Sequence, residues 1–250
     1  VNIHIDLKSE NPPNESHAEF IHPDLVYLSG SIHFIHIMKK KSIIVIFGII
    51  LSLGICSAQD MEKIKLPPAQ KTGGMPLMEA LQNRQSQRSF SSKELSTQQI
   101  SNLLWAAYGI NRPNGYRTAP SARTAHEFDI YIIQSDGWYL YDPEEHAILK
   151  MGNEDLREYA GTQDFVKNAP VNLIFVADFD RMASFDQEKQ IFYSATDVGY
   201  ISQNVYLWCA SEGLATIVRG QIDKTSAKEV LKLAPNQFVI LAQTVGYPGD

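Results

Sequence analysis

Residues 84–90 read Arg84-Gln85-Ser86-Gln87-Arg88-Ser89-Phe90, and the rest of the sequence can be understood from this stretch. It follows a short apolar pattern that predicts a helix, and it carries two arginines four residues apart with a serine between them. In a helix-terminal segment this spacing turns both guanidinium groups to the same side. A planar fork of donors suits a phosphate or carboxylate better than a lysine does. The simpler alternative is a pair of solvated arginines at the end of a surface helix.

Length and composition predict one domain with a substantial core. The chain has 250 residues, of which 44% are hydrophobic. Its net charge of −6 argues against nucleic-acid binding, which needs a basic face to neutralise phosphates. We therefore expect no nucleic-acid partner.

Residues 38–58 have the pattern of a secretory signal peptide. A methionine and three lysines precede an apolar run over residues 43–55, and Cys56-Ser57-Ala58 supplies small residues for cleavage after Ala58. The run is shorter than the roughly 20 residues that a membrane span needs, so an uncleaved anchor is the weaker alternative. We predict an exported, periplasmic protein without a stable membrane span after cleavage. A lipoprotein attached through Cys56 ranks second, because Ile55 is bulky where such signals carry a small residue.

Residues 1–37 hold five of the seven histidines, which would suit a metal-binding segment. We favour a non-native upstream extension instead, because a signal peptide acts from the N-terminus and a polar prefix would hinder it. We predict no metal site. Cleavage leaves Cys209 as the only cysteine, so no intrachain disulfide is expected.

The mature chain is predicted to have an extended lead-in over residues 59–75 and one domain over residues 76–250. Periodicity and capping signals predict helices near 76–84, 96–109, 188–211 and 226–233. Strands are expected near 128–133, 138–141, 147–151, 171–177, 214–218 and 238–245. Strands that alternate with helices, together with one hairpin, indicate an α+β sandwich with a mixed sheet.

The order of the motifs resembles the FMN-dependent nitroreductase family, in particular its SagB-type dehydrogenase-like branch. The Arg-x-Ser-x-Arg-x-Phe stretch is followed by Leu-Leu-Trp-Ala-Ala-Tyr-Gly over residues 103–109 and by Arg-Thr-Ala-Pro-Ser-Ala over residues 117–122. The last motif is Gly-Leu-Ala-Thr-Ile-Val-Arg-Gly-Gln-Ile-Asp over residues 213–223. Each motif is weak by itself, and their order and spacing over residues 76–247 carry the resemblance.

The resemblance implies a dimeric α/β sandwich whose central sheet is mixed but mainly antiparallel and is flanked by helices. It implies that FMN is the cofactor and that Arg84, Arg88 and Ser86 hold its phosphate or ribityl chain. The isoalloxazine ring would be lined from the partner subunit by Pro120, Ser121, Ala122 and Arg123. Gly220 and Gln221 would offer backbone N–H groups near flavin N5 and O4.

These implied roles agree with the chemistry of the residues. Two arginine forks can satisfy a phosphate dianion, and fixed amide dipoles stabilise added charge on a reduced ring. A glycine at position 220 permits close approach of the backbone. Two departures from the family pattern are visible: Arg123 stands where relatives often have glycine, and no basic residue completes the phosphate site near the C-terminus. Two alternatives follow from the missing basic residue: either the affinity for FMN is weaker, or Arg123 or Lys224 substitutes for it.

The function implied by the resemblance is that of an FMN-dependent oxidoreductase. It would pass hydride from a reduced donor, NAD(P)H or another, through flavin N5 to a nitroaromatic, a quinone or a related small acceptor. No side chain is assigned as a catalytic acid or base. The alternatives are a flavin-consuming or peptide-heterocycle-oxidising enzyme of the same fold, or a non-catalytic envelope binding module. Export is unusual for an enzyme that uses NAD(P)H, which leaves the electron donor open.

The helix predicted over residues 188–211 also suggests a homodimer. Ile191, Val198, Ile201 and Val205 belong to one apolar stripe, and no charged residue lies between Val198 and Ala210. A helix on a monomer surface should have a polar opposite face. We therefore expect this helix to be covered on more than one side, either by a second subunit or, as the alternative, within its own subunit.

Overall fold

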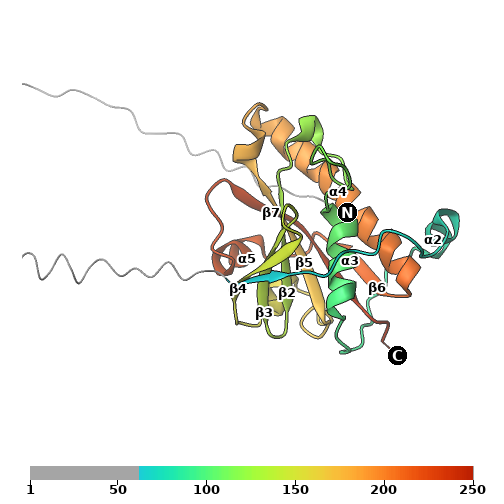
Figure 1. Ribbon diagram of the computed structural model, residues 1–250. Helices are drawn as coiled ribbons and strands as arrows, with labels where there is room; N and C mark the ends of the chain where they lie inside the picture. The colour runs from blue at the N-terminus through green and yellow to red at the C-terminus, as the bar shows by residue number, and fades with distance from the viewer. Residues whose placement is uncertain (1–61, 250) are drawn as a thin grey trace, which may run out of the picture. The chain divides into compact units, whose positions relative to one another are not determined.

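A seven-stranded antiparallel sheet forms the centre of the computed structural model, which describes residues 62–249 (Figure 1). The strand order is β1-β4-β3-β2-β5-β7-β6. The strands are β1 (Lys63–Lys65), β2 (Phe128–Gln134), β3 (Gly137–Asp142), β4 (Ala147–Gly152), β5 (Val171–Asp178), β6 (Ala215–Arg219) and β7 (Gln237–Gly246). The predicted α+β class and mainly antiparallel sheet are confirmed.

The expected mixture of parallel and antiparallel pairs is wrong for residues 62–249, where all six neighbouring pairs are antiparallel. Short turns join β2 to β3 and β3 to β4, and such turns allow only antiparallel pairing. The crossover from β5 to β6 does bring two strands into the same direction. However, β7 inserts between them and pairs with both, so they do not hydrogen-bond to each other.

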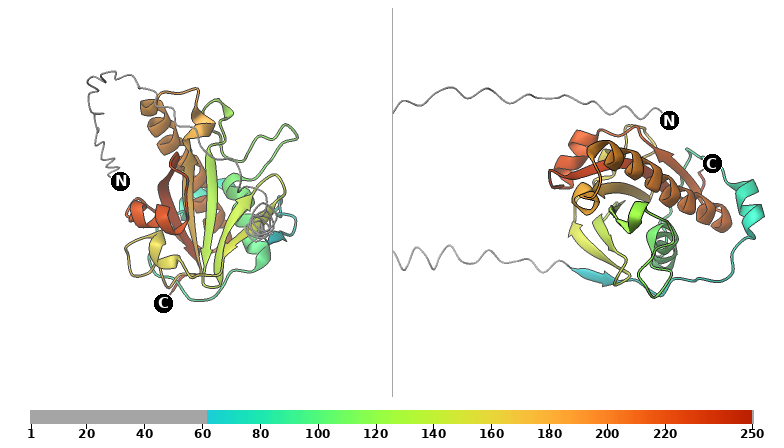
Figure 2. Two further views of the ribbon diagram at one scale, coloured as in Figure 1. Left: turned by 90° about the vertical axis from the view of Figure 1, so that its left-hand side faces the viewer. Right: turned by 90° about the horizontal axis from the view of Figure 1, so that it is seen from above.

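Helices cover both faces of the sheet (Figures 1 and 2). Helices α3 (Thr97–Tyr108) and α4 (Gln187–Glu212) pack on one face, and α5 (Lys224–Val230) packs on the other with the 3-10 turn η2 (Arg157–Ala160). Helix α2 (Leu77–Asn83) stands out beside one end of α4 (Figure 1). Two further 3-10 turns are η1 (Ala122–Thr124) and η3 (Phe179–Met182).

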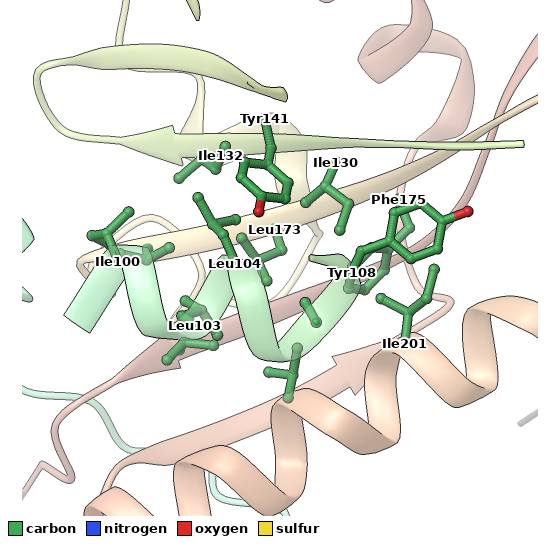
Figure 3. Close-up of a cluster of buried hydrophobic side chains, with 14 of the residues drawn as sticks. Ile100, Leu103, Leu104, Tyr108, Ile130, Ile132, Tyr141, Leu173, Phe175 and Ile201 are labelled. Carbon is green, nitrogen blue, oxygen red and sulfur yellow. The ribbon is translucent and has the colours of Figure 1, made fainter. Parts of the chain in front are cut away.

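The alternation of side chains along the central strand β5 divides the core into two parts. Leu173 and Phe175 face α3 and α4, whereas Ile174 and Val176 face α5. Figure 3 shows the first part, in which Leu104 of α3 lies against side chains of the sheet. Because β5 is buried on both faces, its sequence from Val171 to Ala177 is apolar apart from Asn172, as predicted for a central strand.

Local signals set several boundaries as predicted. The side chain of Ser96 accepts a hydrogen bond from the Gln99 backbone, and the Gln99 side chain accepts one from the Ser96 backbone, which completes the capping box of α3. Helix α4 ends at Gly213, whose φ of 67° suits glycine. The lead-in over residues 59–75 contains a strand that the sequence did not predict. This strand, β1, has only three residues, and it pairs with β4 at the sheet edge.

The predicted extension over residues 1–37, the signal peptide over residues 38–58 and the alternative lipid site at Cys56 all lie outside the described residues. Within residues 62–249, no helix combines the length and apolar character that crossing a membrane requires.

Candidate functional site

The Arg84–Arg88 segment is extended rather than helical. Helix α2 ends at Asn83, and Arg84 caps it with φ −58° and ψ 120°. The side chains of Arg84 and Ser86 both contact Tyr206, so these two lie on the same side of the segment. The helix-terminal basis of the expectation that both arginines point the same way is wrong, and the shared direction itself stays a prediction. Residues four apart lie on the same side both in a helix and in an extended strand. The spacing of the two arginines therefore could not distinguish these two conformations.

The two arginines lack carboxylate partners. Among residues 62–249, neither Arg84 nor Arg88 makes an ion pair, although seven other ion pairs are present. The Arg84 guanidinium lies 5.2 Å from the centre of the Tyr206 ring, and Arg88 is exposed. A cationic pair without a local anion is available for a ligand of opposite charge.

Tyr206 of α4 joins this segment to the sheet. Its hydroxyl lies 2.8 Å from Ser86 Oγ, and it accepts a hydrogen bond of 3.0 Å from the backbone N–H of Val218 in β6. The backbone N–H of Gln87 also donates to the carbonyl of Thr216, at 3.1 Å. The Arg84–Arg88 segment is therefore held along the edge strand β6.

Gly220 and Gln221 follow directly after β6 and are exposed. Their carbonyl oxygens are already used, because Ile222 N–H donates to Gly220 at 3.0 Å and Thr162 N–H donates to Gln221 at 3.4 Å. Val218, which bonds Tyr206, lies only two residues before Gly220. Through Tyr206, Arg84 and Ser86 therefore lie close to Val218, two residues before the predicted ring-contacting backbone.

The predicted loop of Pro120, Ser121, Ala122 and Arg123 lies elsewhere on α4. The backbone N–H of Ala122 donates to Asp197 Oδ2 at 2.8 Å, nine residues before Tyr206 in the same helix. At ~1.5 Å per residue, this is about 13 Å along the helix axis. The single chain does not gather all the predicted residues at one point. Their joining across two subunits stays a prediction.

Backbone strain marks the same loop. Arg123, Thr124 and His126 have φ values of 51°, 55° and 50°, which non-glycine residues rarely adopt. The Arg123 guanidinium lies 4.8 Å from the centre of the Phe185 ring, so this side chain points toward the segment before α4. Arg123 shows no contact with the Arg84–Arg88 segment. Lys224 begins α5, and burial lowers its pKa.

A buried pair of carboxyl groups, Glu127 and Asp197, was not found from the sequence. Glu127 is fully buried, and neither of its carboxyl oxygens has a hydrogen-bond partner. Burial, together with the neighbouring Asp197, raises the pKa of Glu127 to about 7, and burial also raises the pKa of Asp197. Below pH 7 the pair therefore retains a proton. The signal that could have revealed it was an aspartate on the apolar stripe of α4.

Arg219 is a second buried group that the sequence did not reveal. Its guanidinium donates to the carbonyl of Ala160 at 2.8 Å, to Asn172 Oδ1 at 3.1 Å and to the hydroxyl of Thr244. No carboxylate lies among these partners, and burial lowers its pKa to about 10. Gly161 leaves room for this side chain, because an added Cβ would lie 2.7 Å from Arg219 Nε. This network fixes the end of β6 just before Gly220.

Comparison with known proteins identifies the family. The family model described as Nitroreductase family matches residues 81–247. The chain belongs to the nitroreductase family. A candidate nitroreductase from Methanocaldococcus jannaschii is 32% identical over 197 residues, which cover 75% of this chain and 97% of that protein.

Further relatives of this nitroreductase-family chain include a solved structure and an enzyme with a named activity. The crystal structure of a candidate nitroreductase from Ralstonia eutropha has 40% identity and a TM-score of 0.72, and the match covers 75% of this chain and 90% of that one. A protein from Vibrio harveyi named NADPH-flavin oxidoreductase is 29% identical over 102 residues, which cover 38% of this chain and 42% of that protein. The predicted family and fold are confirmed, whereas the SagB-type branch stays a prediction.

Proposed function

We propose that this chain is an FMN-dependent oxidoreductase that passes hydride from a reduced donor, NAD(P)H or another, to a small acceptor such as a nitroaromatic or a quinone. The observation that carries the proposal is the unpaired Arg84 and Arg88 on either side of Ser86, on extended backbone beside β6. The name of the Vibrio harveyi relative supports a flavin and a nicotinamide donor.

The residues fit the chemistry of FMN. A phosphate dianion needs two positive charges and several donors, which the two arginines and the Ser86 hydroxyl supply. Packing against Tyr206 restrains Arg84, so less side-chain freedom is lost when it binds an anion. When bound, the flavin supplies the redox chemistry, accepting hydride from the donor and releasing it to the acceptor. Backbone N–H groups at Gly220 and Gln221 would bind the polar edge of its ring.

We propose further that the active form is a homodimer in which Pro120, Ser121, Ala122 and Arg123 complete the site of the partner subunit. In one subunit, Asp197 holds this loop about 13 Å along α4 from Tyr206, at ~1.5 Å per residue. The outer face of α4 also exposes Phe192 and Tyr200, at 63% and 48% of their surfaces. Large exposed apolar groups that cluster on one face favour association.

The proposed location is the periplasm, after removal of residues 38–58 as a signal peptide. Mass analysis of envelope material should find a chain that begins at Gln59. A chain in that material that still carries residues 1–37 would contradict this proposal.

The function is tested by reconstitution. The purified full chain is incubated with FMN, freed of excess flavin, and examined for flavin absorbance and stoichiometry. We expect one FMN per subunit, and we expect NADPH, NADH or a chemical reductant to bleach it without oxygen. A nitroaromatic or a quinone should then restore the colour. A chain that retains no FMN at micromolar concentration would contradict the proposal and favour the binding-module alternative.

A further inference from the structure

A cavity of about 370 Å³ lies where α3 ends against the start of β2 and the turn between β3 and β4. Its apolar wall includes Phe128, Ile130 and Leu149. None of the residues predicted to bind flavin lines it. Its volume is in the range of small-molecule sites, which usually combine apolar walls with a few placed polar groups. We call it the strand-end cavity.

Three buried polar atoms at this cavity have no hydrogen-bond partner among residues 62–249: Tyr108 Oη, Arg117 Nε and His126 Nδ1. Folded proteins satisfy nearly all such atoms, so three at one cavity indicate a place where something else binds. Tyr108 is only 1% exposed, and Figure 3 shows its hydroxyl directed away from the aliphatic cluster around Leu103 and Leu104. The cavity therefore has a polar end that the protein itself leaves unused.

The unused groups at this end are mainly donors. Arg117 Nε carries a hydrogen and cannot accept. Burial raises the pKa of Tyr108, so its hydroxyl stays protonated and can donate. Burial and the nearby charge of Arg117 lower the pKa of His126, so its ring is neutral at pH 7. The complementary ligand must therefore bring acceptor atoms.

Among ligands that carry acceptor atoms, the positive charge of Arg117 favours an anion. The only carboxylate that forms an ion pair with Arg117 among residues 62–249 is Glu144, 3.8 Å from its NH2 group and 69% exposed on its side chain. The other carboxylates that line the cavity are engaged, because Asp129 pairs with Arg181 at 2.8 Å and Asp142 pairs with Lys63 at 3.6 Å. Of the two arginines that line this cavity, Arg117 therefore has the more weakly held carboxylate partner.

The Arg117 guanidinium is also held in a fixed orientation. Its central carbon lies 4.4 Å from the centre of the Tyr108 ring, so the ring covers one side of the charged group. An arginine that is stacked in this way keeps its edge free for two parallel hydrogen bonds to a carboxylate. The neighbouring Phe128 and Ile130 suit the flat, apolar body of the same ligand.

We propose that the strand-end cavity binds a small aromatic carboxylate, whose carboxylate group contacts Arg117 and Tyr108 and whose ring lies against Phe128 and Ile130. The site is separate from the proposed flavin site and does not depend on it. Its ligand would contact both ends of the strained loop that runs from Arg117 to His126.

Benzoate is the probe for this site, and benzamide is its uncharged analogue of the same shape. Calorimetry on the full chain should show that benzoate binds at least tenfold more tightly than benzamide. Arg117→Gln should lower benzoate affinity at least tenfold and leave benzamide binding unchanged. Glu144→Gln should raise benzoate affinity a few-fold, because it removes the competing carboxylate. Lys167→Gln, which removes an exposed positive charge away from the cavity, is the matched control and should change neither.

Two further measurements separate this site from flavin binding and from misfolding. Arg117→Lys keeps the charge but loses the fork, and it should show an intermediate affinity. Benzoate should bind equally well to FMN-free and FMN-loaded protein and to the Arg84→Ala/Arg88→Ala variant, even if the proposed flavin function fails. Equal affinity for benzamide, affinity that Arg117→Gln and Glu144→Gln leave unchanged, or binding only in the presence of FMN would each overturn the proposal.

Discussion

The backbone N–H of Ala122 donates a hydrogen bond of 2.8 Å to Asp197, which ties the strained loop before β2 to the middle of α4. Asp197 is buried, and its neighbour Glu127 is fully buried with both oxygens unpaired within the chain. Two adjacent carboxylates out of water cannot both ionise at low cost. A retained proton therefore allows Asp197 to remain buried as the acceptor for the loop.

The first prediction concerns the pH dependence of stability. The pKa of Glu127 rises from 4.5 to about 7 on folding, so the folded state binds this proton more tightly than the unfolded state. The resulting stabilisation is fully present below pH 4.5 and is lost as the pH rises through 7. Glu127→Gln should remove this dependence, which amounts to on the order of 1–3 kcal/mol. Urea unfolding at pH 5, 6, 7 and 8 measures it.

The difference between wild type and Glu127→Gln isolates this carboxyl from other titrating groups. The pKa of His126 is lowered by burial, and the charged groups around the pair, Arg117 and Arg181, are the same in both proteins. Glu229→Gln, an exposed substitution in α5, is the control and should follow wild type. Parallel pH profiles for wild type and Glu127→Gln would show that Glu127 titrates normally.

The second prediction concerns the phosphate site. Replacing Arg84 and Arg88 together by alanine should leave the protein folded, because neither side chain makes an ion pair within residues 62–249. Each charge-assisted contact is worth roughly 1.5–3 kcal/mol, so FMN affinity should fall at least about 100-fold. Flavin fluorescence titration measures this change.

Arg112→Ala removes an exposed arginine of the loop before Arg117 and should bind FMN as wild type does. Full flavin content in the double variant would exclude these arginines as phosphate ligands.

The order of elements was predictable from the sequence because local signals agreed with the packing. The run from Val171 to Ala177 could be recognised as a central strand because six of its seven residues are apolar, and Ser96 with Gln99 marked the start of α3. The absence of parallel pairs was not predictable, because no local signal states that β7 inserts between β5 and β6. Strand β1 was missed because Lys63-Ile64-Lys65 is too short and too charged to show a pattern.

Only those residues of the candidate site that belong to a recognisable sequence motif could be predicted. Arg84, Ser86 and Gly220 stand in ordered motifs, and Tyr206 brings Arg84 and Ser86 close to Val218, two residues before Gly220. The burial of Glu127 depends on its approach to Asp197, 70 residues further along the chain, and no spacing rule predicts this contact. Arg219 looked like an ordinary strand residue, since its partners Asn172 and Thr244 become neighbours only in the folded sheet.

The third prediction concerns Tyr206. Its hydroxyl lies 2.8 Å from Ser86 Oγ and accepts a hydrogen bond from Val218 N–H, so Tyr206→Phe leaves both groups without this partner. The variant should lose roughly 1–3 kcal/mol of stability, because an unpaired buried donor is costly. It should also bind FMN more weakly, because the Arg84–Arg88 segment is then less well held. Tyr200→Phe, in the exposed face of the same helix, is the matched control and should change stability little. Thermal unfolding and flavin titration that match wild type would contradict this role of Tyr206.

The last prediction concerns the dimer, and the structure shows which residues of α4 should be substituted to test it. Charges at Ile201 or Val205 were the natural choice from the sequence, but both side chains are fully buried in the core of their own subunit, so charges there would unfold it. The apolar surface available to a partner on α4 is instead Phe192 and Tyr200, and Gly199 between them has no atom near an added Cβ. Tyr200→Glu should therefore weaken dimerisation at least tenfold, because association would bury an unpaired charge, and leave the thermal stability of the monomer unchanged. If the site is shared between subunits, FMN content should fall with it, and added FMN should oppose dissociation on dilution. Sedimentation at micromolar concentration measures the equilibrium between monomer and dimer. Gln203→Glu adds the same charge at another exposed position of α4 and tests the effect of charge alone. A monomer that holds FMN tightly would exclude the composite site.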